Sequence, residues 1–443
     1  MTTATPRARR RPFYGWVIVA AGAGIEFTVG ALMQQVFGGY AAALTREFGW
    51  DRSTIGLGFS LSRLENGILG PAQGWMVDRF GPKFVVRLGL ALIAIGFLLF
   101  SQLWSVPTFY VFYGIMALGA GLAGFMPITV IVVNWFDRQR ARALGLAQIG
   151  FALSGLIAPL VLIAIPLFGW RNMAMLSAFI ILAVGFPISG LMKARPADMG
   201  LRMDGLSEAE EALLREEDSR RNRVSTSTTV DFSAREALRT RAFWMISLGH
   251  GSALLIVGSV MAHLYLHLTL SLGYSDAWAS AFVGIMTGSQ IVGQVVGGYL
   301  GDRISKRLIV ITCMVMHAVG LLLLAHVDAV AATVAFAVLH GSAWGARGPL
   351  MQAIRADYFG RASFGKIMGW SSMITMFGTV SGPFIVGWLY DQSNSYAFGF
   401  TLIALLSVLG SVFFILATRP PLPKRPEGAE PPAEPPSVVA GAH

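Results

Sequence analysis

The sequence predicts an all-α integral membrane protein with twelve transmembrane helices in two pseudo-symmetric six-helix bundles. Three observations predict this fold class: the composition, the number of long apolar windows, and an internal repeat. Of the 443 residues, 54% are hydrophobic and 13% are charged, whereas about 25% charged residues is usual for a water-soluble protein. A lipid bilayer is therefore the expected solvent for most of the chain.

Windows of about 20 apolar residues predict the individual helices, because a helix of that length crosses about 30 Å of hydrocarbon. Twelve such windows occur along the chain. They cover residues 14–38, 53–76, 84–104, 108–134, 143–166, 171–193, 242–270, 277–300, 307–327, 330–353, 364–388 and 396–417.

The basic residues predict the orientation, because cytoplasmic connections of membrane proteins are rich in Lys and Arg. With the N-terminus inside, the short cytoplasmic connections hold Arg79, Lys83, Arg87, Arg138, Arg140, Arg142, Arg303, Lys306, Arg307, Arg355, Arg361 and Lys366. The external connections hold Arg46, Arg52 and Arg171. We therefore expect both termini in the cytoplasm, and we expect the net charge of +10 to face a lipid leaflet rather than a nucleic acid.

The polar stretches divide the chain into five parts. Residues 194–240 contain "SEAEEALLREED" and "STSTT", which are too polar for the bilayer, so they form a predicted cytoplasmic loop. This loop separates a first bundle, 14–193, from a second bundle, 241–418. Residues 1–13 form a predicted cytoplasmic tail that is not a cleavable signal peptide. Residues 419–443 are Pro-rich and predicted to be a disordered cytoplasmic tail.

An internal repeat relates the two bundles. "GWMVDRFGPK" after the second window returns as "GYLGDRISKR" after the eighth. Gly74 and Gly298 are 224 positions apart, and so are Asp78 and Asp302. The repeat indicates a duplicated six-helix unit, an architecture in which two bundles rock about a site between them.

The repeated "GxxxDRxG" pattern, followed by a basic residue, resembles the loop of the major facilitator superfamily. "RPFYGWVIVAAG" at 11–22 and "NWFDRQRARALGLAQIGFALSG" at 134–155 resemble its bacterial monocarboxylate porter and oxalate/formate antiporter branch. The resemblance implies a secondary transporter of the bacterial inner membrane that moves a small organic anion by alternating access with proton coupling. The chain departs from that branch because helix eight carries no cationic group and helix eleven no embedded lysine, which counts against oxalate as the substrate.

The repeated loop is also a predicted conformational latch. Its residues are Gly74, Asp78, Arg79 and Gly81 in the first bundle, with Gly298, Asp302 and Arg303 in the second. Each aspartate can pair with the neighbouring arginine, or accept N–H groups from the start of a nearby helix in one conformation and release them in another. The alternative is that the two aspartates merely cap and orient the loop.

Charges inside apolar windows predict the functional site, because each costs about 2.5–3.5 kcal/mol on insertion scales. Arg63 and Arg347 are candidate substrate ligands, since two guanidinium forks facing a cavity would hold a carboxylate. His340 and Trp344, on the same helix as Arg347, are expected to join this binding wall. The alternative for each arginine is a structural role between helices.

Two carboxylates are candidate proton carriers. Glu26 is preferred, because the protonated form of a carboxyl group is the cheaper one in a low-dielectric medium. Glu65 is the second, but it lies about 200° around the helix from Arg63, so the two cannot both face one cavity. The alternative for either glutamate is a hydrogen bond to another helix.

The remaining features exclude other classes of protein. No "GxxxxGK[ST]" phosphate loop is present, and no nucleophile–base pattern suggests an enzyme. Cys313 is the single cysteine, which excludes an internal disulfide and most zinc sites, and no cofactor, metal or obligate protein partner is expected. Two alternatives to anion transport stay open: efflux of an amphipathic compound on the same fold, and a membrane sensor that does not transport.

Overall fold

The structure is a computed structural model that describes residues 13–220 and 231–423. These residues form helices and connections, with no strand among them. The predicted tails at 1–13 and 419–443 therefore lie almost wholly outside the described residues.

The first half contains the predicted helices one to six. Its elements are α1 (Gly15–Val29), η1 (Gly30–Gln34), α2 (Phe37–Phe48), α3 (Arg52–Ile68), α4 (Gly70–Phe80), α5 (Pro82–Ser101), α6 (Val106–Ala123), α7 (Phe125–Trp135), α8 (Arg140–Phe168), α9 (Trp170–Ile180), η2 (Ile181–Gly185) and α10 (Phe186–Leu191).

The second half contains the predicted helices seven to twelve. Its elements are α13 (Arg241–Leu266), η5 (His267–Ser271), α14 (Asp276–Gly301), α15 (Lys306–His326), α16 (Val330–Phe359), α17 (Phe364–Ser393) and α18 (Tyr396–Leu416). The central segment between the halves also forms helices: η3 (Pro196–Met199), η4 (Met203–Gly205), α11 (Glu208–Arg220) and α12 (Ala234–Leu238).

Ten of the described helical runs are long and apolar enough to cross a membrane by themselves. The other two expected spans are helical but fall outside that set. Expected helix two is divided at Leu69 into α3 and α4, because Pro71 at the start of α4 has no N–H for the helical ladder. Expected helix ten is α16, which is long enough but carries polar side chains along its length.

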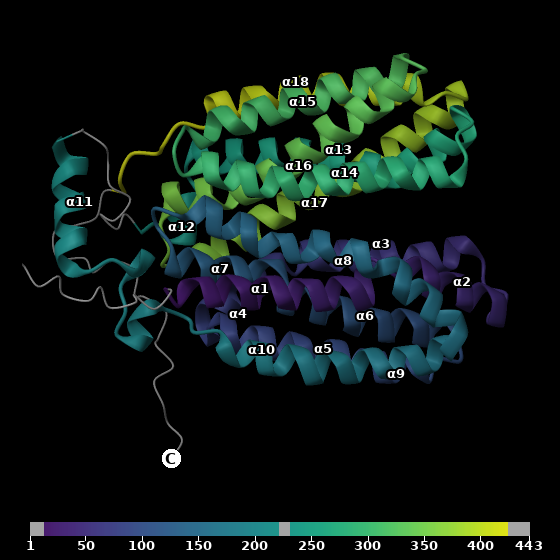
Figure 1. Cartoon of the computed structure of the whole chain (residues 1–443), viewed down its shortest axis with the longest axis horizontal. Helices are drawn as coiled ribbons and strands as arrows, with labels where there is room; N and C mark the ends of the chain where they lie inside the picture. Colours follow the sequence, from purple (N-terminus) through teal and green to yellow (C-terminus); the bar gives the residue numbers. More distant parts are fainter. Residues whose placement is uncertain (1–12, 221–230, 424–443) are drawn as a thin grey trace, which may run out of the picture.

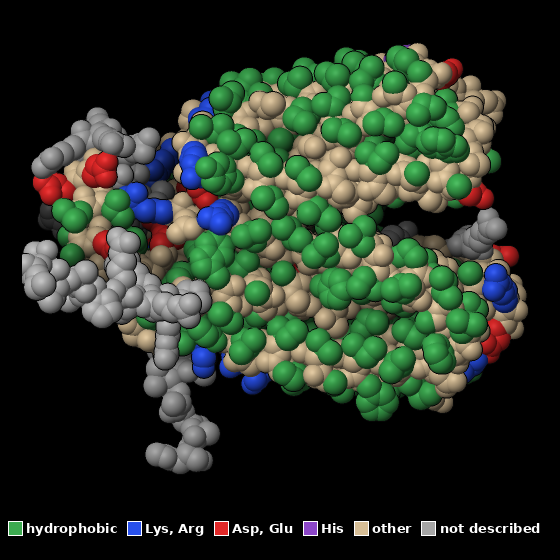
Figure 2. Space-filling model, in the orientation of Figure 1, with side chains coloured by type: hydrophobic (Ala, Val, Ile, Leu, Met, Phe, Trp, Pro, Cys, Tyr) green, Lys and Arg blue, Asp and Glu red, His purple; other side chains and the backbone are tan. Residues whose placement is uncertain are grey.

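The two halves lie side by side along the long axis of the molecule (Figure 1). Hydrophobic side chains are spread over the face of both halves that Figure 2 shows, and charged side chains gather near the two ends, as expected for a surface in contact with lipid. α11 projects at one end of the molecule, which we call the central-segment end; the other is the opposite end. Figure 2 shows a gap between the halves at the opposite end and continuous contact toward the central-segment end.

The most extensive contacts between the halves are those of α4 with α17 and of α8 with α14. Glycine allows this close approach. A Cβ atom on Gly74 would clash with the backbone of Gly365, and one on Gly145 would clash with the backbone of Gln294. Small residues at helix crossings are typical of packing in membranes, where backbones approach closely.

Candidate functional site between the two halves

A central cavity of about 480 Å³ lies between the two halves. Both halves contribute polar side chains to its wall. The first half provides Glu26, Gln34, Ser62, Gln73, Tyr113 and Gln148, and the second provides His250, Gln290, Gln294, Trp344, Gln352, Arg355, Ser371, Ser372, Thr375 and Thr379. Among the side chains that the structure describes, Glu26 is the one acid of this wall and Arg355 the one strong base.

Arg355 lies on α16 and is 2% exposed. Its Nη2 donates to Nδ1 of His250 at 2.9 Å and to Oγ of Ser371 at 2.7 Å. Its Nη1 donates to Oε1 of Gln352 at 3.1 Å and to the Met351 carbonyl at 3.2 Å. All these acceptors are neutral, and no described carboxylate pairs with Arg355, so the wall of the cavity carries an uncompensated positive charge.

The hydrogen bond from Arg355 also fixes the protonation of His250. A guanidinium has no lone pair to offer, so Nδ1 of His250 must be the acceptor. The proton of the neutral ring is then on Nε2. His250 therefore keeps one N–H donor beside the guanidinium, which makes this part of the cavity wall rich in hydrogen-bond donors.

Glu26 lies on α1, in the opposite wall, and is 7% exposed. Among the described residues, no hydrogen bond or ion pair involves its carboxyl group. A buried carboxyl group without a partner is costly to ionise, so it is poised to bind a proton or a cation.

Arg347 is not among the residues that line the cavity in this conformation, so its predicted role in substrate binding stays a prediction. Its side chain is 1% exposed, and its Nε and Nη1 have no partner among the described residues. His340 is also fully buried, and its Nδ1 contacts Nδ1 of His317 on α15 at 3.0 Å. Of the expected wall residues on α16, Trp344 alone lies in the cavity wall of the described structure.

The structure describes only one of the two charged side chains expected in helix two. Arg63 lies in α3, but its side chain is outside the described part of the structure. Glu65 is half-buried, and its carboxylate lies near Gly114 on α6 rather than in the cavity wall. Glu65 therefore faces another helix of its own half in this conformation.

Arg355 is a cavity residue that the sequence does not predict. The apolar window ends at residue 353, so the sequence places Arg355 in a short connection. In the structure α16 continues to Phe359, so Arg355 lies inside the helix and within the fold. One signal could have found it: Gln352 and Arg355 are three residues apart, so they share a helix face.

Toward the central-segment end, the two repeated aspartates close the molecule. Oδ1 of Asp78 accepts the Gly365 N–H and Oδ2 accepts the Lys366 N–H, both at 3.0 Å. Asp302 accepts the N–H groups of Ala141 at 2.9 Å and Arg142 at 3.1 Å. Each carboxylate thus binds the first turn of a helix in the other half, where free N–H groups and the helix dipole favour a negative charge.

The other predicted latch residues take different positions. Arg303 donates to the Tyr299 carbonyl at 3.2 Å and lies over the Tyr299 ring, so it does not pair with Asp302. Arg79 is exposed. Gly81 ends α4 at a φ of +82°, a backbone conformation that glycine adopts at low cost. The helix N–H groups, rather than the neighbouring arginines, are the partners of both aspartates.

A buried ion pair strengthens the same closure. Arg140, at the start of α8, is 2% exposed and binds Asp357 at the end of α16, which also binds Lys306 at 2.8 Å. Arg140 also pairs with Asp137 of its own half at 2.8 Å.

The sequence profile of the Major Facilitator Superfamily matches residues 23–289 and 246–441. The chain belongs to the major facilitator superfamily. Three features agree with this membership: the repeated loop, the twelve helical spans and the cavity between the two halves.

Three curated members of transporter families resemble the chain over part of its length. The oxalate:formate antiporter of Oxalobacter formigenes is 25% identical over 50% of this chain and 49% of its own length. The glycerol-3-phosphate transporter of Bacillus subtilis is 27% identical over 37% of this chain and 38% of its own. Monocarboxylate transporter 13 of Bos taurus is 33% identical over 24% of this chain and 25% of its own. The chain thus spans about half the length, or less, of these relatives.

Solved structures of this superfamily share the fold over nearly the whole chain. The proton:xylose symporter XylE, bound to 6-bromo-6-deoxy-D-glucose, superposes with a TM-score of 0.72 at 15% identity, covering 91% of this chain and 95% of its own. The human organic anion transporter MFSD10 superposes with a TM-score of 0.69 at 15% identity, covering 91% of this chain and 100% of its own. With the family match and the long apolar helices, the chain is an integral, multi-pass membrane protein of the major facilitator superfamily.

Proposed function

We propose that this transporter moves a small organic anion, with a monocarboxylate as the first candidate, by alternating access coupled to protons. The observation that carries the proposal is the uncompensated Arg355 guanidinium in the cavity wall, with neutral His250 beside it. A buried cation without a counter-ion is costly, and a substrate carboxylate would supply the missing negative charge. Arg355 takes the role that the sequence assigned to Arg347.

Glu26 is the proposed proton carrier. It faces the same cavity from the first half, so a proton on Glu26 and an anion on Arg355 would occupy one site together. Binding of both neutralises the two walls of the cavity before the halves move. This pairing supports symport, in which a proton gradient drives accumulation of the anion.

The direction of opening follows from the predicted orientation. If the central-segment end is cytoplasmic, as the basic residues predict, the gap at the opposite end faces outward (Figure 2). The structure would then be the conformation that accepts a substrate from outside. We place the transporter in a bacterial inner membrane, with both termini in the cytoplasm.

Uptake of labelled carboxylates into proteoliposomes tests the proposal. The panel contains acetate, lactate, pyruvate and oxalate, each with and without an imposed inward proton gradient. We expect at least one monocarboxylate to accumulate only with the gradient, and external unlabelled substrate to compete. If no carboxylate enters in either condition while the folded protein is present, the anion proposal fails.

One observation favours a second candidate, efflux of an amphipathic compound. The cavity wall includes four methionines, Met33, Met126, Met368 and Met376. Methionine side chains adapt to apolar ligands of different shapes. Energised export of a lipophilic fluorescent dye, with no carboxylate uptake, would support this candidate over the first.

A further inference from the structure

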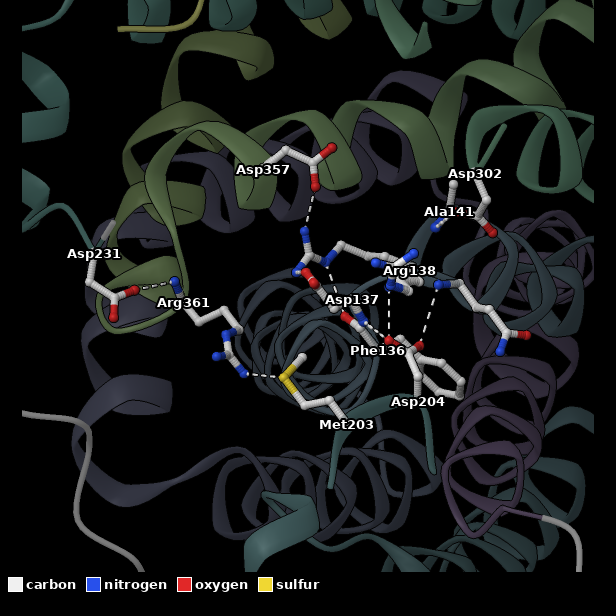
Figure 3. A network of polar contacts seen from close by, with 12 residues as sticks. Phe136, Asp137, Arg138, Ala141, Met203, Asp204, Asp231, Asp302, Asp357 and Arg361 are labelled. Carbon is white, nitrogen blue, oxygen red and sulfur yellow. Dashed lines mark hydrogen bonds and ion pairs between the residues drawn. The ribbon is translucent and has the colours of Figure 1, made fainter. Parts of the chain in front are cut away.

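An aspartate of the central segment binds the turn between α7 and α8. Oδ2 of Asp204 accepts the N–H of Asp137 at 3.1 Å and the N–H of Arg138 at 2.8 Å, and its Oδ1 accepts the Gln139 N–H at 3.3 Å (Figure 3). The N–H groups before and within the first turn of a helix have no intrahelical partner. Asp204 supplies partners for three of them.

A second aspartate binds the corresponding turn between α16 and α17. Oδ1 of Asp231 accepts the N–H of Arg361 at 2.7 Å and the N–H of Ala362 at 3.1 Å. The next residue, Phe232, donates its N–H to the Phe359 carbonyl at 2.9 Å and packs its ring edge-on against Phe359. This part of the central segment is thus held on the second half.

The two turns are equivalent under the internal repeat. Asp137 and Arg361 are 224 positions apart, and so are Ala141 and Gly365. Each turn is therefore bound twice in the same pattern. One aspartate of the central segment binds its first N–H groups, and one aspartate of the opposite half binds the N–H groups four residues later.

The central segment also bridges the halves next to Asp204. Nη1 of Arg361 donates to Sδ of Met203 at 2.7 Å, so Met203 contacts the second half while Asp204 binds the first (Figure 3). The start of the segment is fixed on α7, because Nε1 of Trp135 donates to the Lys193 carbonyl at 2.8 Å.

The backbone conformation and the burial of Asp204 are both unfavourable, so its hydrogen bonds must offset their free-energy cost. Its φ is +55°, in the left-handed region that residues other than glycine rarely adopt. Burial raises the pKa of its carboxyl group, as does neighbouring Asp137 to a smaller extent, against the backbone N–H groups of the turn, which lower it. Residues held in this way are typical of functional positions.

We propose that Asp204 and Asp231 are positioning residues of the transport cycle, which hold the two turns so that Asp302 and Asp78 can bind the N–H groups that follow. The consequence is that the central segment favours the conformation closed at the central-segment end. This inference goes beyond the proposed function and does not depend on which substrate is carried.

The contacts of Asp204 and Asp231 differ from those of Asp78 and Asp302 in whether they cross between the halves. Asp231 directly precedes the second half and binds it, and Asp204 is tied through Lys193 to the first half, so both contacts survive when the halves separate. The contacts of Asp78 and Asp302 cross between the halves and must break. Replacing Asp204 or Asp231 should therefore change closure of the central-segment end only indirectly, by changing the conformation of the turn that each residue binds.

Distances between the halves test the proposal in full-length protein in lipid nanodiscs. Spin labels go on cysteines at exposed positions, after Cys313→Ser. Phe84→Cys with Leu308→Cys reports the central-segment end, and Leu167→Cys with Leu270→Cys reports the opposite end. Pulsed electron paramagnetic resonance then gives the population of each conformation.

We expect Asp204→Ala and Asp231→Ala each to raise the population open at the central-segment end by roughly tenfold, since hydrogen bonds to a charged group are lost from the turn. The matched control is Asp198→Asn. Asp198 belongs to the same segment but accepts only the local N–H of Arg195, at 3.1 Å, among the described contacts. The control should leave both distance distributions unchanged.

A double-mutant cycle separates positioning from a role in folding. If Asp204 acts through the turn that Asp302 binds, Asp204→Ala should have little further effect on the distances once Asp302→Ala is present. Additive effects, or unchanged distances in folded Asp204→Ala and Asp231→Ala proteins, would overturn the proposal. Lower thermal stability with unchanged distances would also overturn the proposal, because it would show that the two aspartates have a purely structural role.

Discussion

Nη2 of Arg355 donates to Nδ1 of His250 at 2.9 Å, so a permanent cation and a neutral imidazole share one wall of the central cavity. The cation is 2% exposed, and its described partners are all neutral. Burying a guanidinium without a counter-ion is unfavourable, and hydrophobic packing alone would not require it. This uncompensated charge is the observation on which the proposed anion site rests.

The first prediction concerns Arg355. Arg355→Lys keeps the charge but loses the planar fork, so we expect about tenfold weaker anion binding. Arg355→Gln removes the charge and should weaken binding by about a hundredfold or more. Binding is measured by competition in proteoliposomes, with folding checked by size-exclusion chromatography. Arg347→Gln is the comparison: if it abolishes anion binding while Arg355→Gln does not, the cavity cation has been assigned to the wrong residue.

The second prediction concerns Glu26. Glu26→Gln cannot release a proton, so it should lose accumulation driven by a pH gradient but retain exchange of internal for external anion. Exchange needs no return of an empty, deprotonated carrier. Counterflow and gradient-driven uptake are measured on the same proteoliposomes. A variant that still accumulates substrate against its gradient would remove Glu26 from proton coupling, and Glu65→Gln would then be tested.

The third prediction concerns the latch. Asp78→Asn and Asp302→Asn should slow turnover about tenfold or more while changing substrate affinity less than threefold, because these residues bind helix N–H groups rather than the ligand. The measurement compares maximal transport rate with equilibrium binding. Equal losses in both quantities would count against the latch, and unchanged transport per folded molecule would indicate a simple cap.

The fourth prediction concerns pH. Burial raises the pKa of Asp302 from 3.8 to about 6, and nearby Asp204 also raises it, although the N–H groups of Ala141 and Arg142 and the charge of Lys306 lower it. The prediction takes this carboxyl group to face water in the open conformation, where it would titrate near its ordinary value.

The state with the higher pKa binds a proton more tightly, so acidification favours it. Between pH 7 and pH 5 we expect the closed conformation to gain by up to about tenfold, and this gain should disappear as the pH rises above about 6. Spin-label distances across the central-segment end measure the effect. Asp302→Asn should remove the part of the response that Asp302 contributes, and opening of this end on acidification would contradict the prediction.

The fifth prediction concerns Gly298. A Cβ atom there would lie 2.9 Å from the Ala141 carbonyl oxygen and from the Arg142 Cα. Gly298→Ala should therefore destabilise the closed conformation by about 1–3 kcal/mol, as overpacking does. Gly284→Ala on the same helix is the control, since a Cβ atom there meets nothing within 4 Å. Equal distance distributions for the two variants would show that close approach at Gly298 is not required.

The helical spans and the family could be predicted from the sequence because the bilayer imposes a simple rule. A segment of about 20 apolar residues must be helical to satisfy its own backbone in lipid. The repeated loop can also be predicted from the sequence, because Asp78 and Asp302 occupy equivalent positions in the repeats of the two halves. These features depend on local sequence and on the solvent rather than on which helix faces which.

The site was harder to predict, because a charge inside a helix can face the cavity, another helix or lipid. The sequence favours Arg347 as the cavity residue. Arg347 is buried and is not among the residues that line the cavity, whereas Arg355, two helical turns later, lies in the wall. The two arginines are about 80° apart around the axis of α16. A modest error in the predicted rotation of this helix about its axis therefore selects the wrong arginine as the cavity residue.

The sequence by itself determined the membrane location, the two related halves and the presence of costly charges at membrane depth. The tertiary structure decided which charges meet. It brought Arg355 to His250, left Glu26 without a described partner on the other side of the cavity, and placed Asp204 beside the turn that Asp302 also binds. The physical reason is that the facing of a long helix and the docking of a polar segment depend on close contacts between residues far apart in the chain, which apolar periodicity does not encode.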